Sequence, residues 1–281
     1  MALFLGVDGG GTGCRAVVAD ASGRRLGEGR AGAANIVTDL DGACANILTA
    51  TQMALGASAE LSALHAVLGL AGATVPGYAE RLAAALPFAQ TVIVSDAVTA
   101  LRGALHDEDG IAAMIGTGSV FAAQRLGQVT VTGGWGFILG DEGGGAWLGR
   151  SLLAGALQAQ DGLIAMTPLL SQVIQEVGGP HGLVEFARTA RPGDFARYAP
   201  RIVTASEDAA ADHVLRAAET WITREIDHLA AEPTVPVTFL GGLGPIFADR
   251  LAARYGARLR KPLGSGLDGA LWMALLEAQN A

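Results

Sequence analysis

The sequence predicts an α/β protein made of two lobes around a central cleft. A chain of 281 residues is long for a single hydrophobic core, so two compact units are expected. Strand-like and helix-like patterns alternate along the chain, as is typical of α/β folds. A strand–turn–strand unit with a Gly-Thr-Gly core occurs twice, near residues 3–19 and 111–125, which indicates a weak internal duplication. We find no long linker, so the lobes are expected to share one cleft.

Three short strands are predicted to open the first lobe. Apolar runs at 3–7, 15–19 and 26–30 are separated by turn signals at 9–13 and 21–24. Such an antiparallel meander differs from the strand–turn–helix unit that binds dinucleotides. The glycines of the first turn therefore need a different explanation.

Helix and strand patterns alternate through the rest of the first lobe, which we place at residues 1–104. Thr38 is expected to cap a helix in which Asp41 occupies the capping-box position. An apolar stripe at helical spacing continues from there to Leu55. The elements that follow are a strand at 65–70, a helix at 78–86, a strand at 91–95 and a helix at 97–105.

The second lobe, at residues 105–265, is predicted to repeat the opening strands and then to become mainly helical. A long helix is expected after Ser206, with Glu207 and Asp208 in its first turn. A final helix at 266–281 is expected to fold back on the first lobe. The other predicted elements are strands at 111–115, 120–125, 129–132 and 235–240 and helices at 145–159, 166–177 and 182–190.

The composition excludes several classes of function. The formal net charge is −8 and the chain has no basic block, so nucleic acid is not expected as a partner. No stretch approaches the ~20 apolar residues of a membrane span, and the first residues do not resemble a signal peptide. Cys14 and Cys44 fit a reduced cytoplasmic protein better than a disulfide. Lys261 is the single lysine, which excludes a lysine-dependent phosphate loop.

Residues 8–13 combine a carboxylate with a glycine-rich turn at the end of a strand. The glycines leave backbone N–H groups that a phosphate can approach closely. Thr12 adds a hydroxyl donor, and Asp8 can hold Mg²⁺ through water. A plain glycine hairpin turn is the alternative. A second such turn at 116–119, again after an apolar strand, favours a phosphate held from two sides.

Asp96 follows the apolar strand at 91–95. A carboxylate at the C-terminal end of such a strand faces the crevice in which α/β proteins bind ligands. Phosphoryl transfer to a hydroxyl group needs a carboxylate that orients the hydroxyl and accepts its proton. A cap for a helix that begins at Ala97 is the alternative, and the two roles are compatible.

The segment 133–145 has the most unusual composition in the chain. Seven of its thirteen residues are glycine, and they surround Trp135, Asp141 and Glu142. A sugar site needs acceptors for hydroxyl groups and an apolar surface for a ring face, and these three side chains supply both. A flexible loop whose acids cap the next helix is the alternative. The other tryptophans, Trp147, Trp221 and Trp272, lie in helical patterns and are predicted to belong to the core.

Taken together, these segments resemble the family that joins N-acetylglucosamine kinases, bacterial glucosamine kinases and the BadF/BadG/BcrA/BcrD ATPases. The resemblance spans essentially the whole chain and depends on the order and separation of its motifs. Those motifs are residues 7–12, 34–36, 95–97, 115–119, 133–136 and 140–143.

The resemblance implies two ribonuclease-H-like lobes of the actin-like ATPase superfamily that close over Mg-ATP and a sugar. It implies ATP-dependent phosphorylation of the 6-hydroxyl of an amino sugar, with ATP and Mg²⁺ as cofactors, in a cytoplasmic homodimer. Asp96 would be the catalytic base, and Asp8 would lie near the metal. The residues implied at ATP are Gly10, Gly11, Thr12, Thr117, Gly241 and Gly242. The residues implied at the sugar are Asn35, Asp96, Gly118, Ser119, Trp135 and Asp141.

The identity of the sugar stays open between glucosamine and N-acetylglucosamine. Residues 13–16, 160–162 and 268–271 look more like glucosamine kinases, whereas Trp135 and the pair 141–142 look more like N-acetylglucosamine kinases. We lean slightly to glucosamine.

Two further points stay open. Gly144 stands where many relatives carry a small hydroxyl residue, so a sugar or loop contact is in doubt. An ATPase switch that acts on a protein partner is the alternative function. The activator branch of the family holds an iron–sulfur cluster with cysteines from two chains, and Cys14 and Cys44 lie away from the expected positions.

Overall fold

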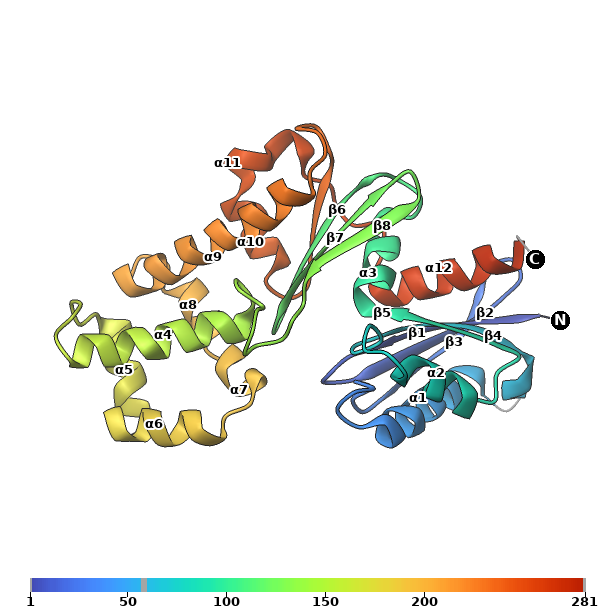
Figure 1. The fold of residues 1–281 in the computed structure, drawn as a ribbon, viewed down its shortest axis with the longest axis horizontal. Helices are drawn as coiled ribbons and strands as arrows, with labels where there is room; N and C mark the ends of the chain where they lie inside the picture. Colours follow the sequence, from blue (N-terminus) through green and yellow to red (C-terminus); the bar gives the residue numbers. More distant parts are fainter. Residues whose placement is uncertain (1, 57–59, 280–281) are drawn as a thin grey trace. The chain divides into compact units, whose positions relative to one another are not determined.

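The computed structural model describes residues 2–56 and 60–279, and the chain divides into two compact units. The first unit comprises Met1–Ala112, Ala122–Val129 and Lys261–Ala281. The second comprises Ala113–Phe121 and Thr130–Arg260. Each unit has its own combination of sheet and helices (Figure 1).

A five-stranded sheet forms the centre of the first unit (Figure 1). Its strands are β1 (Leu3–Gly9), β2 (Cys14–Asp20), β3 (Arg25–Ala31), β4 (Leu64–Leu70) and β5 (Gln90–Ser95). Their order across the sheet is β3-β2-β1-β4-β5. The pairs β1–β2 and β2–β3 are antiparallel, as the meander predicts, whereas β1–β4 and β4–β5 are parallel.

Helices cover both faces of this sheet. They are α1 (Leu40–Leu55), α2 (Tyr78–Ala85), α3 (Asp96–Leu105) and α12 (Gly266–Gln279), with a short 3₁₀ turn at Leu61–Ala63. Leu5 and Val7 of β1 pack with residues of α1 and α2 in one core cluster. Phe4 packs on the other face with Leu267 and Leu271 of α12. Because successive side chains of a strand point to opposite faces, β1 is buried on both sides and forms a nearly continuous apolar run.

Helix α12 approaches β1 and α3 backbone to backbone. A Cβ atom placed on Gly6 would lie 2.5 Å from the backbone nitrogen of Leu271. A Cβ atom on Gly269 would overlap the carbonyl oxygen of Thr99 in α3. These glycines are therefore required by packing, and they fix the last helix of the chain onto the first strand.

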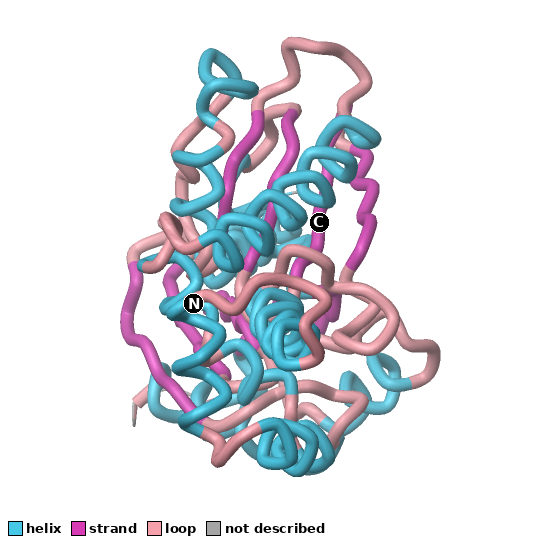
Figure 2. The backbone as a smooth tube through the Cα atoms, turned by 90° about the vertical axis from the view of Figure 1, so that its left-hand side faces the viewer, coloured by secondary structure: helices cyan, strands magenta, loops and turns pink. Residues whose placement is uncertain are grey.

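The second unit contains most of a four-stranded sheet and a large helical region. The sheet has the order β8-β7-β6-β9, with β6 (Gly110–Ile115), β7 (Ser119–Arg125), β8 (Gln128–Gly133) and β9 (Val237–Leu240). The unit boundaries fall within β6, β7 and β8. The helix that follows β9 packs against this strand. Figure 2 shows the helices and strands of the chain from a second side.

Nine helical elements belong to the described part of the second unit. They are α4 (Gly145–Gln160), α5 (Pro168–Glu176), α6 (Pro180–Thr189), α7 (Pro192–Ala196), α8 (Ala199–Thr204), α9 (Ala209–Leu229), α10 (Gly244–Arg250), α11 (Ala252–Tyr255) and a 3₁₀ turn at Gly256–Arg258. No helix within residues 2–56 and 60–279 is long and apolar enough to cross a bilayer.

The structure corrects two predicted helix starts. Helix α1 is capped by Asp39, whose carboxylate accepts a hydrogen bond from the Gly42 N–H at 2.9 Å, and not by Thr38. Asp208 is the N-cap of α9 rather than a residue of its first turn, because its carboxylate accepts from the Ala210 N–H at 2.9 Å. Several polar residues precede each helix, and only the backbone conformation selects the one that caps it.

We predict that Gly269→Ala destabilises the protein by roughly 1–3 kcal/mol, because the added methyl group overpacks the contact between α12 and α3. Gly193→Ala is the matched control. A Cβ atom at Gly193 meets nothing within 4 Å, and its effect is expected to stay within about 0.5 kcal/mol. Urea denaturation of the two variants measures the difference, and equal stability would contradict the backbone contact.

Candidate functional site

Asp8 and Asp96 stand at the same edge of the first sheet. Asp8 is the second-last residue of β1, and Asp96 directly follows β5. Because β1, β4 and β5 run parallel, their carboxyl ends meet at one edge. Burial raises the pKa of Asp96, and the negative charge of Asp8 raises this pKa further. A carboxyl group with a raised pKa is a stronger base than an ordinary aspartate once it is ionised.

The capping role considered for Asp96 belongs to its neighbour. The hydroxyl of Ser95 accepts a hydrogen bond from the Val98 N–H at 3.4 Å, and α3 begins at Asp96 itself. Asp96 Oδ1 accepts from the Ala97 N–H at 2.9 Å, which orients the carboxylate. Asp96 is therefore not needed to cap the helix.

Asp8 is held by an ion pair with Arg15, and the Asp8 side chain is 22% exposed. Its carboxylate also lies close to Gly266 at the start of α12. Within residues 2–56 and 60–279, no group of three or more His, Cys, Asp or Glu side chains could hold a metal ion by itself. The donor set fits Mg²⁺ that arrives with phosphate ligands, since Mg²⁺ commonly takes only one or two protein carboxylates and keeps several waters.

The turn between β1 and β2 is open in front of its glycines. A Cβ atom on Gly10 or Gly11 would meet nothing within 4 Å, and Gly11 and Thr12 are exposed. The turn is closed by a hydrogen bond of 2.9 Å from the Gly10 N–H to the Gly13 carbonyl oxygen. Gly9 differs, because a Cβ atom there would lie 2.7 Å from a methyl carbon of Leu70.

Asn35 is partly engaged by its own turn. Its side-chain oxygen accepts hydrogen bonds from the Val37 N–H at 3.1 Å and the Thr38 N–H at 3.2 Å. No acceptor for its amide nitrogen lies within hydrogen-bond distance in the part of the chain that the structure describes. The side chain is therefore fixed in place with its donor group available to a ligand.

In the second unit, the turn 116–119 is tied to the segment that leads into α4. The Ala146 N–H donates to the Thr117 carbonyl oxygen at 2.9 Å, and the Ser119 hydroxyl donates to the Glu142 carbonyl oxygen at 2.8 Å. The Thr117 side chain itself is exposed. The two predicted ligand loops of this unit are thus one hydrogen-bonded assembly.

The glycine pair after β9 joins the same assembly. Gly241 has φ 84°, and a Cβ atom there would overlap the Ile115 carbonyl oxygen, so the fold requires this glycine. A Cβ atom on Gly242 meets nothing within 4 Å. The Leu243 N–H donates to the Ile115 carbonyl oxygen at 3.0 Å, which places the pair beside the turn that contains Thr117.

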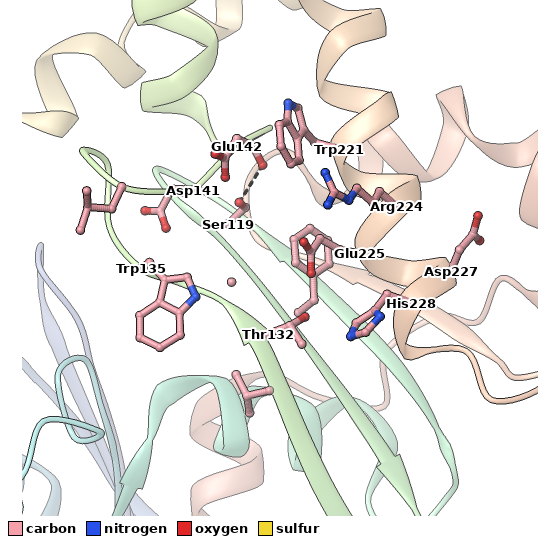
Figure 3. A pocket seen from close by; sticks show the side chains of 15 residues that line it. Ser119, Thr132, Trp135, Asp141, Glu142, Trp221, Arg224, Glu225, Asp227 and His228 are labelled. Carbon is pink, nitrogen blue, oxygen red and sulfur yellow. Dashed lines mark hydrogen bonds between the residues drawn. The ribbon is translucent and has the colours of Figure 1, made fainter.

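Ser119, Trp135 and Asp141 line a cavity of about 770 Å³ in the second unit (Figure 3). The Trp135 side chain is 78% exposed. Asp141 has φ 61°, and its Oδ1 accepts from the Gly136 N–H at 3.1 Å. Burial raises the pKa of Asp141, and the charge of Glu142 raises it further. The other carboxylate oxygen of Asp141 packs on Gly118, where a Cβ atom would overlap it.

One wall of this cavity was not predicted from the sequence. Trp221, Arg224, Glu225 and His228 of α9 face the cavity opposite the strand residues (Figure 3). The prediction that Trp221 belongs to the core is therefore wrong for this tryptophan. The spacing i, i+3, i+4, i+7 was the available signal, because it places these four residues on one helix face.

Gly144 packs directly on the turn 116–119. A Cβ atom at Gly144 would lie 2.6 Å from the carbonyl carbon of Gly118. The small hydroxyl residue that the family resemblance leads us to expect here does not fit the present arrangement of the two loops. Glycine here allows the loop before α4 to sit against the turn at backbone distance.

The two units, with glycine-rich loops at the ends of their strands, identify the fold class of the protein. The predicted fold class, an α/β protein with two lobes of the actin-like ATPase type, is confirmed. A glucokinase of the ROK family from Streptomyces griseus shares this fold, with 17% identity and a TM-score of 0.56 over 99% of this chain and 100% of that one.

The chain belongs to the BadF/BadG/BcrA/BcrD ATPase family, whose model matches residues 5–244. The glucosamine kinase GspK of Vibrio cholerae is 30% identical over 282 residues, which cover 98% of this chain and 96% of the relative. A solved structure of a proposed N-acetylglucosamine kinase from Chromobacterium violaceum is 33% identical and has a TM-score of 0.89. This match covers 98% of this chain and 99% of that one.

Proposed function

We propose that this protein transfers the γ-phosphoryl group of ATP to the 6-hydroxyl of an amino sugar, with glucosamine preferred over N-acetylglucosamine. The similarity to kinases of both sugars supports the reaction class. One observation in the structure carries the proposal, and it concerns the glycines of the predicted ATP loops.

At most glycine positions of the described chain, the fold itself explains why the residue is glycine. Either their φ lies in the left-handed region or a Cβ atom would press on neighbouring atoms. Six glycines in residues 2–56 and 60–279 combine open space with φ outside that region. They are Gly10, Gly11, Gly116, Gly193, Gly242 and Gly256. Gly10, Gly11 and Gly242 are among the predicted ATP ligands, and Gly116 precedes Thr117. A ligand that approaches the backbone closely explains glycine at these four positions.

Each predicted nucleotide residue then has a proposed task. The hydroxyl groups of Thr12 and Thr117 bind phosphate oxygens, and Gly241 and Gly242 lie at the adenosine. Asp8 holds Mg²⁺ through water. The ion, when bound with ATP, supplies positive charge that neutralises the phosphate oxygens.

Asp96 is proposed as the base that takes the proton of the 6-hydroxyl. Its carboxylate is oriented by the Ala97 N–H and has a raised pKa. Asn35, Gly118, Ser119, Trp135 and Asp141 are proposed to contact the sugar. Of these, Asn35 offers a donor, Asp141 an acceptor and Trp135 an apolar ring face.

The lining of the cavity supports glucosamine. Asp141, Glu142, Glu225 and Asp227 contribute carboxylates to it, against the single arginine Arg224. The free amine of glucosamine is cationic and gains from nearby carboxylates, whereas an N-acetyl group is neutral and gains nothing from them. The family resemblance also supports a homodimer in the cytoplasm.

The proposal is tested by ADP release from Mg-ATP against glucosamine, N-acetylglucosamine, glucose, N-acetylmannosamine and no sugar. We expect release to depend on an amino sugar and to be fastest with glucosamine. A preference for N-acetylglucosamine would keep the reaction and correct the substrate. Equal hydrolysis with every sugar and with none would point to an ATPase switch instead.

Replacing the proposed base should affect turnover and leave sugar binding nearly intact. We expect Asp96→Asn to lower kcat by about 10²–10⁴-fold and to change the Kd of the sugar by less than about threefold. Asp107→Asn, which alters an exposed aspartate in the same unit, is the control. Turnover of Asp96→Asn equal to that of the control would remove Asp96 from the role.

The pH dependence of kcat reports the same group. A base acts when it is deprotonated, so activity is complete above the pKa of Asp96 and falls as pH drops through it. Burial and the charge of Asp8 raise this pKa. We therefore expect kcat to fall on the acidic side of its pH profile with a midpoint above the ordinary aspartate pKa of about 3.9.

Adding a methyl group to an open glycine should separate ligand binding from folding. We expect Gly11→Ala and Gly116→Ala to leave the unfolding temperature within about 2 °C of wild type, because nothing in the fold opposes the methyl. We expect the Kd of Mg-ATP to rise about tenfold, which corresponds to about 1.4 kcal/mol. Gly193→Ala, with equally open space, should change neither quantity. An unchanged Kd in both loop variants would contradict close phosphate approach.

A further inference from the structure

Three charged residues form a row across the first three strands. In the sheet register, Asp8 of β1 stands opposite Arg15 of β2, and Arg15 stands opposite Arg30 of β3. Residues directly opposite in antiparallel strands point to the same face with Cβ atoms about 5 Å apart. The three side chains therefore share one face of the sheet, and the row carries two positive charges and one negative charge.

The row lies beside the open glycine turn. Residues 10–13 connect β1 to β2, so Asp8 and Arg15 flank this turn on its two strands. Phe4 and Asp8 alternate with the residues between them, so they share a face, and Phe4 packs on α12 there. Asp8 in turn lies near Gly266, the first residue of α12. The three charged side chains therefore lie on the sheet face that α12 covers, at the end of the covered region.

Asp8 forms an ion pair with only one of the two arginines. Its carboxylate forms the ion pair with Arg15, whose side chain remains 46% exposed. In the chain as described, no carboxylate lies within ion-pair distance of Arg30, which is exposed. Like charges directly opposite one another destabilise a sheet. β3 is an edge strand, where a charged residue opposes pairing with another sheet. That role does not need a positive charge directly opposite Arg15, which is the arrangement found here.

A guanidinium group can serve two acceptors at once. Arginine has five N–H donors in a planar fork, and one carboxylate oxygen of Asp8 uses only part of them. The remaining donors suit the oxygens of a phosphate group, which arginine binds with geometric specificity. Lys261 is the single lysine of the chain, so arginines supply nearly all of its cationic side chains.

We propose that Arg15 and Arg30 bind the phosphoryl group that is transferred, with Asp8 holding the guanidinium of Arg15 in place. This inference rests on the proposed kinase function. The group is a terminal phosphate in both of its states, as the γ-phosphate of the nucleotide before transfer and as the sugar phosphate after it. Neither arginine belongs to the residues assigned above to the nucleotide or the sugar.

The test is calorimetric binding of three probes to wild type, Arg15→Gln, Arg30→Gln and the control Arg24→Gln. The probes are β,γ-imido-ATP with Mg²⁺, ADP with Mg²⁺, and glucosamine 6-phosphate. Arg24 is an exposed arginine that pairs with Asp20 at the turn before β3. We expect Arg15→Gln to weaken β,γ-imido-ATP, glucosamine 6-phosphate or both by at least about tenfold. ADP should weaken less than about threefold.

Arg30→Gln should weaken the same probes by about threefold and leave the affinity for ADP unchanged, because Arg30 stands one strand further from the turn. Arg15→Lys keeps the charge and should recover part of the affinity, which guards against a folding defect in Arg15→Gln. A loss of affinity for β,γ-imido-ATP alone indicates that the arginines bind the phosphoryl group before transfer. A loss of affinity for glucosamine 6-phosphate alone indicates that they bind it after transfer.

Two results would overturn the inference. In the first, both glutamine variants bind β,γ-imido-ATP and glucosamine 6-phosphate as the wild type does. In the second, ADP is weakened as much as the other probes, which would assign the arginines to the nucleotide as a whole. If the wild type binds neither nucleotide, the proposed function itself fails, and the inference fails with it.

Discussion

Burial of β1 on both faces is the constraint on which the first unit depends. Leu5 and Val7 bind the strand to the core under α1 and α2, and Phe4 binds it to α12. A strand packed on both sides has little freedom to move, so its last residues are held in fixed positions. Asp8 and the glycine turn after it therefore stand at a rigid point, although they are at the surface.

Glycine serves two opposite purposes in this protein. At Gly6 and Gly269 it removes a side chain so that two parts of the chain can touch. At Gly10, Gly11 and Gly242 it leaves space that the protein does not fill. The first kind is explained by packing density inside the fold. The second kind has no packing reason, and at the predicted ATP loops we attribute it to the proposed ligand.

Features that depend on local pattern were predictable, and features that depend on register or tertiary packing were not. Strand ends, the two Gly-Thr-Gly turns and Asp96 after its strand could be read from the order of residues. The cap at Asp39, the short helices of the second unit and the cavity wall formed by Trp221 could not. Four-residue to seven-residue helices have too little periodicity to detect, and Trp221 fits a core stripe as well as a cavity face. The row of Asp8 and the two arginines required the pairing of three strands.

Asp141, which lines the cavity, has a strained backbone conformation. Its φ of 61° lies in the region that glycine occupies freely and other residues occupy with strain. Replacement by glycine would relieve that strain and also remove a carboxylate of raised pKa from the cavity wall. Replacement by glycine would also remove the acceptor of the hydrogen bond from the Gly136 N–H. Under the proposed function, the strain at Asp141 is tolerated because it keeps a carboxylate in the cavity wall.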